Sequence, residues 1–197
     1  SKATISRIIT DEVSVFHKEK ASIVAAGLQS TDYQHIDDTG ARVNGKNHYT
    51  HVLCNPFYTA YFTRPAKDRL TVLKILAGKD LEFHLNEESL LLMRNLGLPE
   101  KHLVQMERLC SQSKVLTEAE VDEWLHHLFP NLNKHHKNRK VIKEASAITA
   151  YKYRDDAIKI LLSDDAPQFK SITEYLSLCW VHDGRHYKKL KPFRREN

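Results

Sequence analysis

Residues 33–63 read YQHIDDTGARVNGKNHYTHVLCNPFYTAYFT, and they carry the strongest secondary-structure signals of the chain. The dipeptide Asn44-Gly45 separates two β-prone runs, residues 33–43 and 48–54. Both turn residues accept the positive φ of a type I′ turn, so the pattern predicts a hairpin. A second turn at Asn55-Pro56 is followed by residues 57–63, which are rich in aromatic side chains and threonine. We therefore expect three consecutive antiparallel strands.

The segments after these strands complete an α/β pattern. Residues 70–76 carry the apolar stripe of a helix that Gly78 can end. Residues 157–162 are apolar enough for a buried central strand, which runs into Ser163-Asp164-Asp165-Ala166-Pro167. A short helix should follow, and residues 176–181 have strand character. Three antiparallel strands, a helix and a buried strand ending in an acid predict an RNase H-like mixed sheet with further strands.

The remaining segments are helical in pattern. Apolar residues at helical spacing predict an N-terminal helix over residues 5–28 within a helical segment, 1–30. Asn86 can cap a helix over residues 87–95, and Thr117 begins a capping-box sequence for a helix that reaches Phe129. We find no strand pattern in residues 81–151. The expected organisation is an RNase H-like core, residues 31–80 and 152–197, interrupted by an all-helical insertion, residues 81–151.

The composition is that of a globular protein with a basic C-terminal region. The chain has 197 residues, of which 41% are hydrophobic and 28% are charged, so wholesale disorder is excluded. Its three cysteines are widely spaced, which argues against a disulfide framework and for a reduced, cytoplasmic protein. We find no segment long and apolar enough for a membrane span and expect no membrane partner. The net charge of +5 is concentrated near the C-terminus, at residues that suit DNA phosphates: Lys188, Lys189, Lys191, Arg194 and Arg195.

Two acidic pairs, Asp37-Asp38 and Asp164-Asp165, lie within or at the end of β-prone segments. A carboxylate on a buried strand is costly unless it is paired or bound to a metal. If the strands that hold Asp37 and Asp164 are neighbours, their carboxylates can bind divalent ions such as Mg²⁺. Asp38 and Asp165 should face the other way and are second choices. The alternative is that both pairs are ordinary strand-end turns or caps.

Three motifs in this order resemble the RNase H-like DDE transposases of bacterial insertion sequences, in their Cys-Trp-x-His type. Residues 35–40, HIDDTG, look like the first-Asp motif of that family. Residues 160–169, ILLSDDAPQF, are similar to its second-Asp motif. Residues 179–182, CWVH, together with Arg185, resemble its Cys-x-x-His signature. The resemblance covers residues 33–187, apart from the insertion.

The resemblance implies a transposase catalytic core that cleaves and transfers DNA strands at transposon ends. In that reading Asp37 and Asp164 are the catalytic metal ligands for two Mg²⁺ or Mn²⁺ ions. Cys179, His182 and Arg185 would support the site or its DNA strand; the alternative for the first two is a buried thiol and a packing histidine. The partners implied are double-stranded DNA and further copies of the chain, in the nucleoid region of the bacterial cytoplasm.

The family's third acid, a Glu on a later helix, has no good match. Glu196 lies next to the last residue, so we expect the catalytic Glu beyond residue 197 and this chain to be inactive alone. A non-catalytic DNA-binding or assembly fragment of a decayed or truncated transposase therefore remains the alternative. The dipeptide His182-Asp183 is a weaker match to metal-dependent HD phosphohydrolases, because no further Asp follows it. The paired histidines at 126–127 and 135–136 are expected at the surface.

Overall fold

The computed structural model describes residues 1–11 and 13–190 of the chain. Two helices begin it: α1 spans Lys2–Asp11 and α2 spans Val13–Gln29. The single helix expected over residues 5–28 is thus present as two, with residue 12 between them outside the described residues. None of the described helices is long and apolar enough to span a membrane.

A five-stranded sheet has the order β3-β2-β1-β6-β7. Strands β1, β2 and β3 are antiparallel, whereas β6 and β7 continue the sheet in parallel with β1. This topology is RNase H-like and confirms the predicted fold class. The strands span Tyr33–Val43 (β1), Lys46–Asn55 (β2), Tyr58–Arg64 (β3), Ile160–Ser163 (β6) and Tyr175–Leu178 (β7).

Local sequence signals explain where the first elements turn and end. Asn44 and Gly45 both have positive φ, 50° and 76°, as the type I′ turn between β1 and β2 requires. Helix α3, Arg69–Ala77, begins at Asp68, whose carboxylate accepts the backbone N–H of Thr71. The same helix ends at Gly78, which adopts the left-handed conformation.

The sheet has one face that packs into the core and one that does not. The covered face carries Ile36, Leu53 and Ala60, which are side by side in the strand register and at most 6% exposed. Helix α2 is attached to this face because the side-chain amides of Gln34 and Asn55 both donate to the carbonyl of Gly27. We call the other side the open face; its residues, which are exposed or half-buried, include His35, Asp37, Val52 and Cys54.

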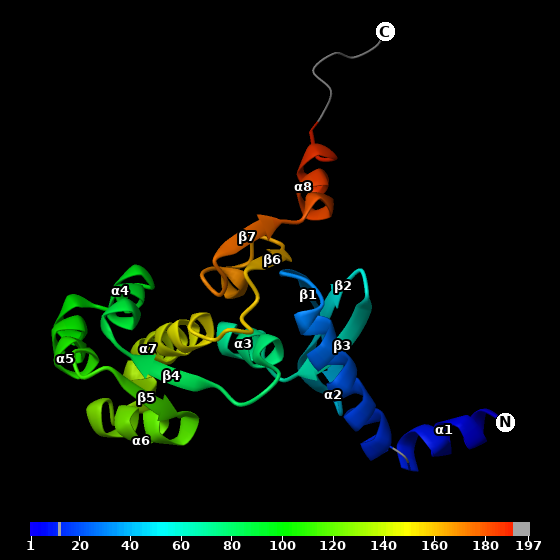
Figure 1. Cartoon of the computed structure of the whole chain (residues 1–197), viewed down its shortest axis with the longest axis horizontal. Coiled ribbons are helices and arrows are strands. Elements are labelled where there is room, and N and C mark those ends of the chain that lie inside the picture. The colour runs from blue at the N-terminus through cyan, green and yellow to red at the C-terminus, as the bar shows by residue number, and fades with distance from the viewer. Residues whose placement is uncertain (12, 191–197) are drawn as a thin grey trace, which may run out of the picture.

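The insertion lies between α3 and β6 in the sequence and forms a lobe of its own (Figure 1). It is mainly helical: α4 (Glu87–Asn95), α5 (Glu100–Cys110), α6 (Glu118–Leu128) and α7 (Leu132–Lys152). The caps predicted at Asn86 and Thr117 are both present as capping boxes. The second half of α7 is buried and joins the lobe to the core that also contains Leu73 and Ile75 of α3.

The expectation of an all-helical insertion is wrong in one respect. Strands β4 (Glu82–Leu85) and β5 (Lys114–Thr117) pair as a small antiparallel sheet. Each strand has only four residues, too few for a strong alternating pattern, and they are far apart in sequence. Phe83 and Leu85 are buried under α7 while Glu82 and His84 point outward, so the alternation exists but is very short.

The last expected strand is also shorter than predicted. Residues 176–181 have strand character, but β7 ends at Leu178 and α8 spans Trp180–Tyr187. The reason is that β7 pairs with β6, which ends at Ser163, so there is no strand to pair with residues beyond Cys179. Trp180 and Val181 instead lie on a helix and are 84% and 68% exposed. The short helix expected before β7 is the 3₁₀ helix η1, Pro167–Phe169.

Candidate metal centre

The parallel pairing of β1 with β6 brings Asp37 and Asp164 together. His35 is the register partner of Leu162, and each aspartate follows two residues later. Side chains two residues apart on a strand share a face, so both carboxylates lie on the open face at the same level of the sheet. The structure therefore makes neighbours of two acids that are 127 positions apart in the chain.

Backbone hydrogen bonds orient both carboxylates. Asp164 Oδ1 accepts the N–H of Ala166 at 3.0 Å, which forms a tight turn at the end of β6. Asp37 Oδ1 accepts the N–H of Asp38 at 2.8 Å. Within the described part of the chain, neither carboxylate forms an ion pair with a lysine, arginine or histidine. Two unneutralised carboxylates at one place repel each other and favour binding of a cation.

His182 reaches the same place from α8. The N–H of Cys179 donates to the carbonyl of Ser163 at 2.8 Å, which extends the β6–β7 pairing by one residue and fixes the start of α8 beside Asp164. The N–H of His182 then donates to the carbonyl of Cys179 at 3.0 Å, in the first helical turn. His182 Nδ1 is buried and has no hydrogen-bond partner among the described residues.

Asp37, Asp164 and His182 together have the donor atoms of a divalent-metal site. One ligand atom from each lies within 4.8 Å of the other two. Carboxylate oxygens suit Mg²⁺ and Mn²⁺, and an imidazole nitrogen is a common ligand of transition metals. The buried, unpartnered nitrogen of His182 leaves a ring nitrogen available as a ligand. The residues therefore fit a metal ion.

Sequence reasoning identified His182 as a supporting residue and not as a ligand candidate. The sequence signal that could have identified His182 as a ligand candidate is its position three residues after Cys179. A histidine in the first turn of a helix can face back toward the strand that precedes the helix. That inference required the boundary between β7 and α8, which the strand-like pattern of residues 176–181 concealed.

Two cysteines line the small cavity, of about 100 Å³, that holds the three ligand candidates. Cys179 was expected near the site and is there, and Cys54, on the neighbouring β2, was not expected. Burial raises the pKa of the Cys54 thiol, so at neutral pH this side chain is a neutral thiol rather than a thiolate ligand. Both cysteines are free and half-buried.

The other acid of each pair has a different environment. Asp38 lies on the covered side, where its carboxylate accepts from Gln168 at 2.8 Å and pairs with Lys67 at 3.3 Å. Asp165 is an exposed acid, 2.8 Å from Lys170. Both carboxylates thus have a lysine partner, which Asp37 and Asp164 lack within the described residues.

A hollow of about 390 Å³ beside the centre is lined by both acidic and basic side chains. Arg185, His186 and Lys189 line it together with Asp164, Asp165, His182 and Asp183. Arg185, predicted as a supporting residue, thus lines the same hollow as Asp164 and His182. Lys188 and Lys189 are exposed at the end of α8. The further predicted DNA contacts, Lys191, Arg194 and Arg195, lie outside the described residues, as does Glu196.

Comparison with known proteins identifies no family. The chain is 28% identical over 175 residues to an uncharacterized protein, y4jO, of Sinorhizobium fredii. The similarity covers 85% of this chain and 51% of y4jO, so the chain spans about half the length of this relative. No protein-family model and no solved structure matches the chain.

Proposed function

We propose that this chain is the RNase H-like core of a DDE-type transposase, which cleaves and transfers DNA strands at transposon ends with the help of divalent metal ions. The observation that carries the proposal is the convergence of Asp37 and Asp164 on the open face, with His182 beside them. The order of motifs in the sequence and the mixed sheet that holds them support it further.

In this proposal each residue at the centre has a stated task. Asp37 and Asp164 hold Mg²⁺ or Mn²⁺, and His182 provides a third donor for one ion. Bound divalent ions of this kind activate a water or a DNA hydroxyl and stabilise the leaving oxygen during phosphoryl transfer. Arg185 would contact a non-bridging phosphate oxygen, because its guanidinium is a planar donor and it lines the same hollow as Asp164.

DNA would approach over the hollow beside α8. The hollow contains basic side chains that suit the phosphate backbone of double-stranded DNA, those of Arg185 and Lys189. The exposed Lys188 adds a third. Contacts of this type give affinity without sequence preference, so recognition of a particular transposon end requires other residues. We also propose that several copies of the chain act together on two DNA ends. This would take place in the bacterial cytoplasm, beside the nucleoid.

A second candidate is a DNA-binding or assembly module without catalysis. The exposed basic side chains of α8 favour this candidate, because they can bind DNA without any metal. The two candidates differ at the acids. A catalytic core needs Asp37 and Asp164 as metal ligands, whereas a bare binding module does not.

Titration with Mn²⁺, followed by electron paramagnetic resonance, distinguishes the candidates. Wild type should bind Mn²⁺, and Asp37→Asn and Asp164→Asn should each bind at least tenfold more weakly, because each removes one charged ligand. The matched control is Asp165→Asn, which changes the adjacent exposed acid and should bind like wild type. His182→Gln should show a smaller loss than either aspartate variant.

DNA affinity provides the second half of this test. Asp37→Asn should bind a DNA duplex as tightly as wild type or more tightly, because it removes a negative charge near the phosphates. Equal Mn²⁺ binding by wild type and by Asp37→Asn would overturn the catalytic proposal, as would no Mn²⁺ binding by wild type. In either case, retained DNA affinity would leave the binding module as the function.

A further inference from the structure

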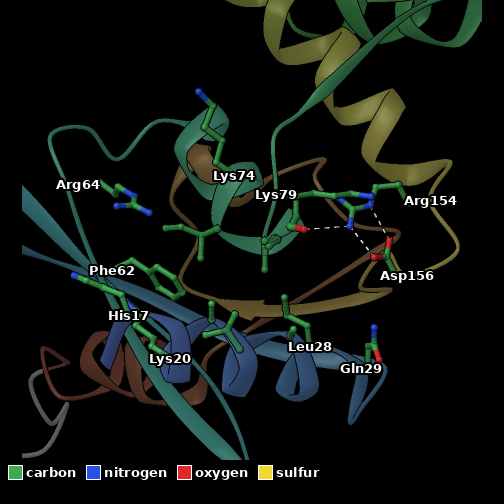
Figure 2. A pocket seen from close by; sticks show the side chains of 17 residues that line it. His17, Lys20, Leu28, Gln29, Phe62, Arg64, Lys74, Lys79, Arg154 and Asp156 are labelled. Atoms are coloured by element: carbon green, nitrogen blue, oxygen red, sulfur yellow. Dashed lines mark hydrogen bonds and ion pairs between the residues drawn. The ribbon is translucent and has the colours of Figure 1, made fainter. Parts of the chain in front are cut away.

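A groove separate from the metal centre lies between α2 and α3 (Figure 2). It has a volume of about 400 Å³, within the size range of ligand sites. Its floor is apolar, formed by Val24 and Leu28 of α2, Phe62 of β3, and Leu76 and Ala77 of α3. No residue that lines this groove lines the cavity of the metal centre. A groove with such a floor suits an apolar helix face.

The rim of the groove is cationic. Lys20, Arg64 and Lys79 line it and form no ion pair within the described part of the chain. The excess of positive charge at this end of the groove comes from Lys20 and Arg64 lying close together without an acidic neighbour among the residues that line it there, and Lys20 also donates to the carbonyl of Tyr61. Two further cations of the rim are already neutralised, Lys74 by Glu118 and Arg154 by Asp156, each at 2.7 Å. The occupant should therefore carry negative charge at one end.

Helix α1 is an element with an exposed apolar face and no packing partner among the described residues. It buries no side chain, and Ile5, Ile8 and Ile9 are 61%, 51% and 54% exposed. Their spacing places all three on one face of the helix. An isolated ten-residue helix is marginal in water, so its stability requires packing against something. At its C-terminal end, Asp11 and the last carbonyls supply negative charge.

The groove and the helix match in length. The α2 residues that line the groove run from His17 to Gln29, which corresponds to about 18 Å of helix at about 1.5 Å per residue. Helix α1 has ten residues and is therefore about 15 Å long. Length and apolar surface thus agree between two features of the same chain. Charge agrees at the C-terminal end of α1, where Asp11 lies; the basic residues of the helix, Lys2 and Arg7, precede its last turn.

Helix α1 cannot reach the groove of its own chain. The groove begins at His17, and α2 is helical from Val13 onward. One residue separates the two helices, which is too short for α1 to fold back alongside α2. Figure 1 shows α1 directed away from the rest of the molecule. A second copy of the chain can supply the helix instead.

We propose that α1 of one copy docks, by Ile5, Ile8 and Ile9, in the α2–α3 groove of a second copy, and that the second copy does the same in return. Such an exchange is self-complementary and closes as a twofold dimer. It forms two identical apolar contacts, each with the acidic end of α1 at the cationic rim. This interface does not depend on the metal centre or on DNA.

Two variants test the two sides of the interface separately. Ala25→Arg places a bulky cation in the groove at an exposed position of α2; the matched control is Ala26→Arg, exposed on the same helix but outside the groove. The triple variant Ile5→Gln, Ile8→Gln, Ile9→Gln removes the apolar face of α1 while keeping good helix formers. Its control is Thr10→Gln, on the same helix. Circular dichroism should show that all four remain folded.

Sedimentation velocity then measures the mass in solution. Wild type and both controls should be dimers, and each test variant alone should dimerise at least tenfold more weakly. A mixture of the two test variants should form a one-to-one heterodimer, because an intact helix from one can enter the intact groove of the other. Fluorescence transfer between labelled chains detects this heterodimer.

Three results would overturn the proposal. A wild-type chain that stays monomeric at about 100 μM has no interface of useful strength. An Ala25→Arg variant that dimerises like wild type, while the isoleucine variant does not, would mean that α1 helices pair with each other. A mixture of the two variants that shows no heterodimer would exclude exchange between helix and groove. None of these results bears on the Mn²⁺ binding of the metal centre.

Discussion

Consecutive residues of each strand lie on opposite faces of the central sheet, and the two faces have different environments. On β1, Asp38 faces the covered side, where it pairs with Lys67 and accepts a hydrogen bond from Gln168, whereas Asp37 faces the open side without an ion-pair partner in the described residues. On β2, Leu53 is fully buried and its neighbour Val52 is half-buried. Adjacent residues of similar chemistry thus lie in different environments: one face packs into the core, and the other presents the ligand candidates.

The largest effect expected from this difference is on stability. Leu53→Ala should lower the free energy of unfolding by about 3 kcal/mol, because it leaves a cavity in the core. Val52→Ala, one residue away on the open face, should cost less than about 1 kcal/mol. Urea unfolding of the two variants measures both values. Equal losses would mean that the open face is packed as tightly as the covered one.

The acids of β1 should respond in opposite ways. Asp38→Asn breaks an ion pair with a half-exposed lysine and should destabilise the chain by up to about 1 kcal/mol. Asp37→Asn should leave the metal-free chain unchanged or slightly more stable, because it removes repulsion with Asp164. Added Mn²⁺ should raise the melting temperature of wild type and of Asp38→Asn, since it binds the folded state, but not that of Asp37→Asn.

Thermal unfolding with and without Mn²⁺ checks this pair of variants. If Mn²⁺ stabilised Asp37→Asn as much as wild type, the ion would be binding somewhere other than the open face. If Asp37→Asn destabilised the metal-free chain more than Asp38→Asn, Asp37 would have a structural task and the contrast between the faces would disappear.

The smallest effect concerns DNA at the end of α8. Replacing Lys188 and Lys189 with alanine should weaken duplex binding uniformly across sequences. It should also lower the salt slope of the affinity by about 2, since each phosphate that a lysine neutralises contributes about 0.9 to that slope. The matched control replaces Lys101 and Lys114, two exposed lysines of the insertion. Fluorescence anisotropy at several salt concentrations measures the slope. Equal slopes in both double variants would remove α8 from the DNA surface.

The sequence predicts which residues lie on the open face better than it predicts the helices and strands around that face. Asn44-Gly45 sets the register of β1 and β2, and strict alternation along β1 then separates Asp37 from Asp38. The apolar run before Asp164 identifies β6 as an inner strand. These inferences hold because a hairpin turn and an alternating strand are local properties, and the pairing of β1 with β6 follows from the order of the elements.

Features that depend on distant partners were not predicted. Strands β4 and β5 form only because they meet each other across 28 residues of α4, α5 and their connections. The end of β7 at Leu178 depends on where β6 ends, and the inward position of His182 depends in turn on the end of β7. Residues 176–181 alternate well enough for a longer strand, so local pattern alone favoured the wrong boundary.

We propose that Asp37 and Asp164 are ligands of one metal centre. Anomalous diffraction from crystals grown with Mn²⁺ tests it most directly. We predict a manganese peak on the open face, about 2.1 Å from an oxygen of each of the two carboxylates. A map in which manganese is absent from the space between Asp37 and Asp164, at a concentration that saturates Mn²⁺ binding in solution, would contradict the claim.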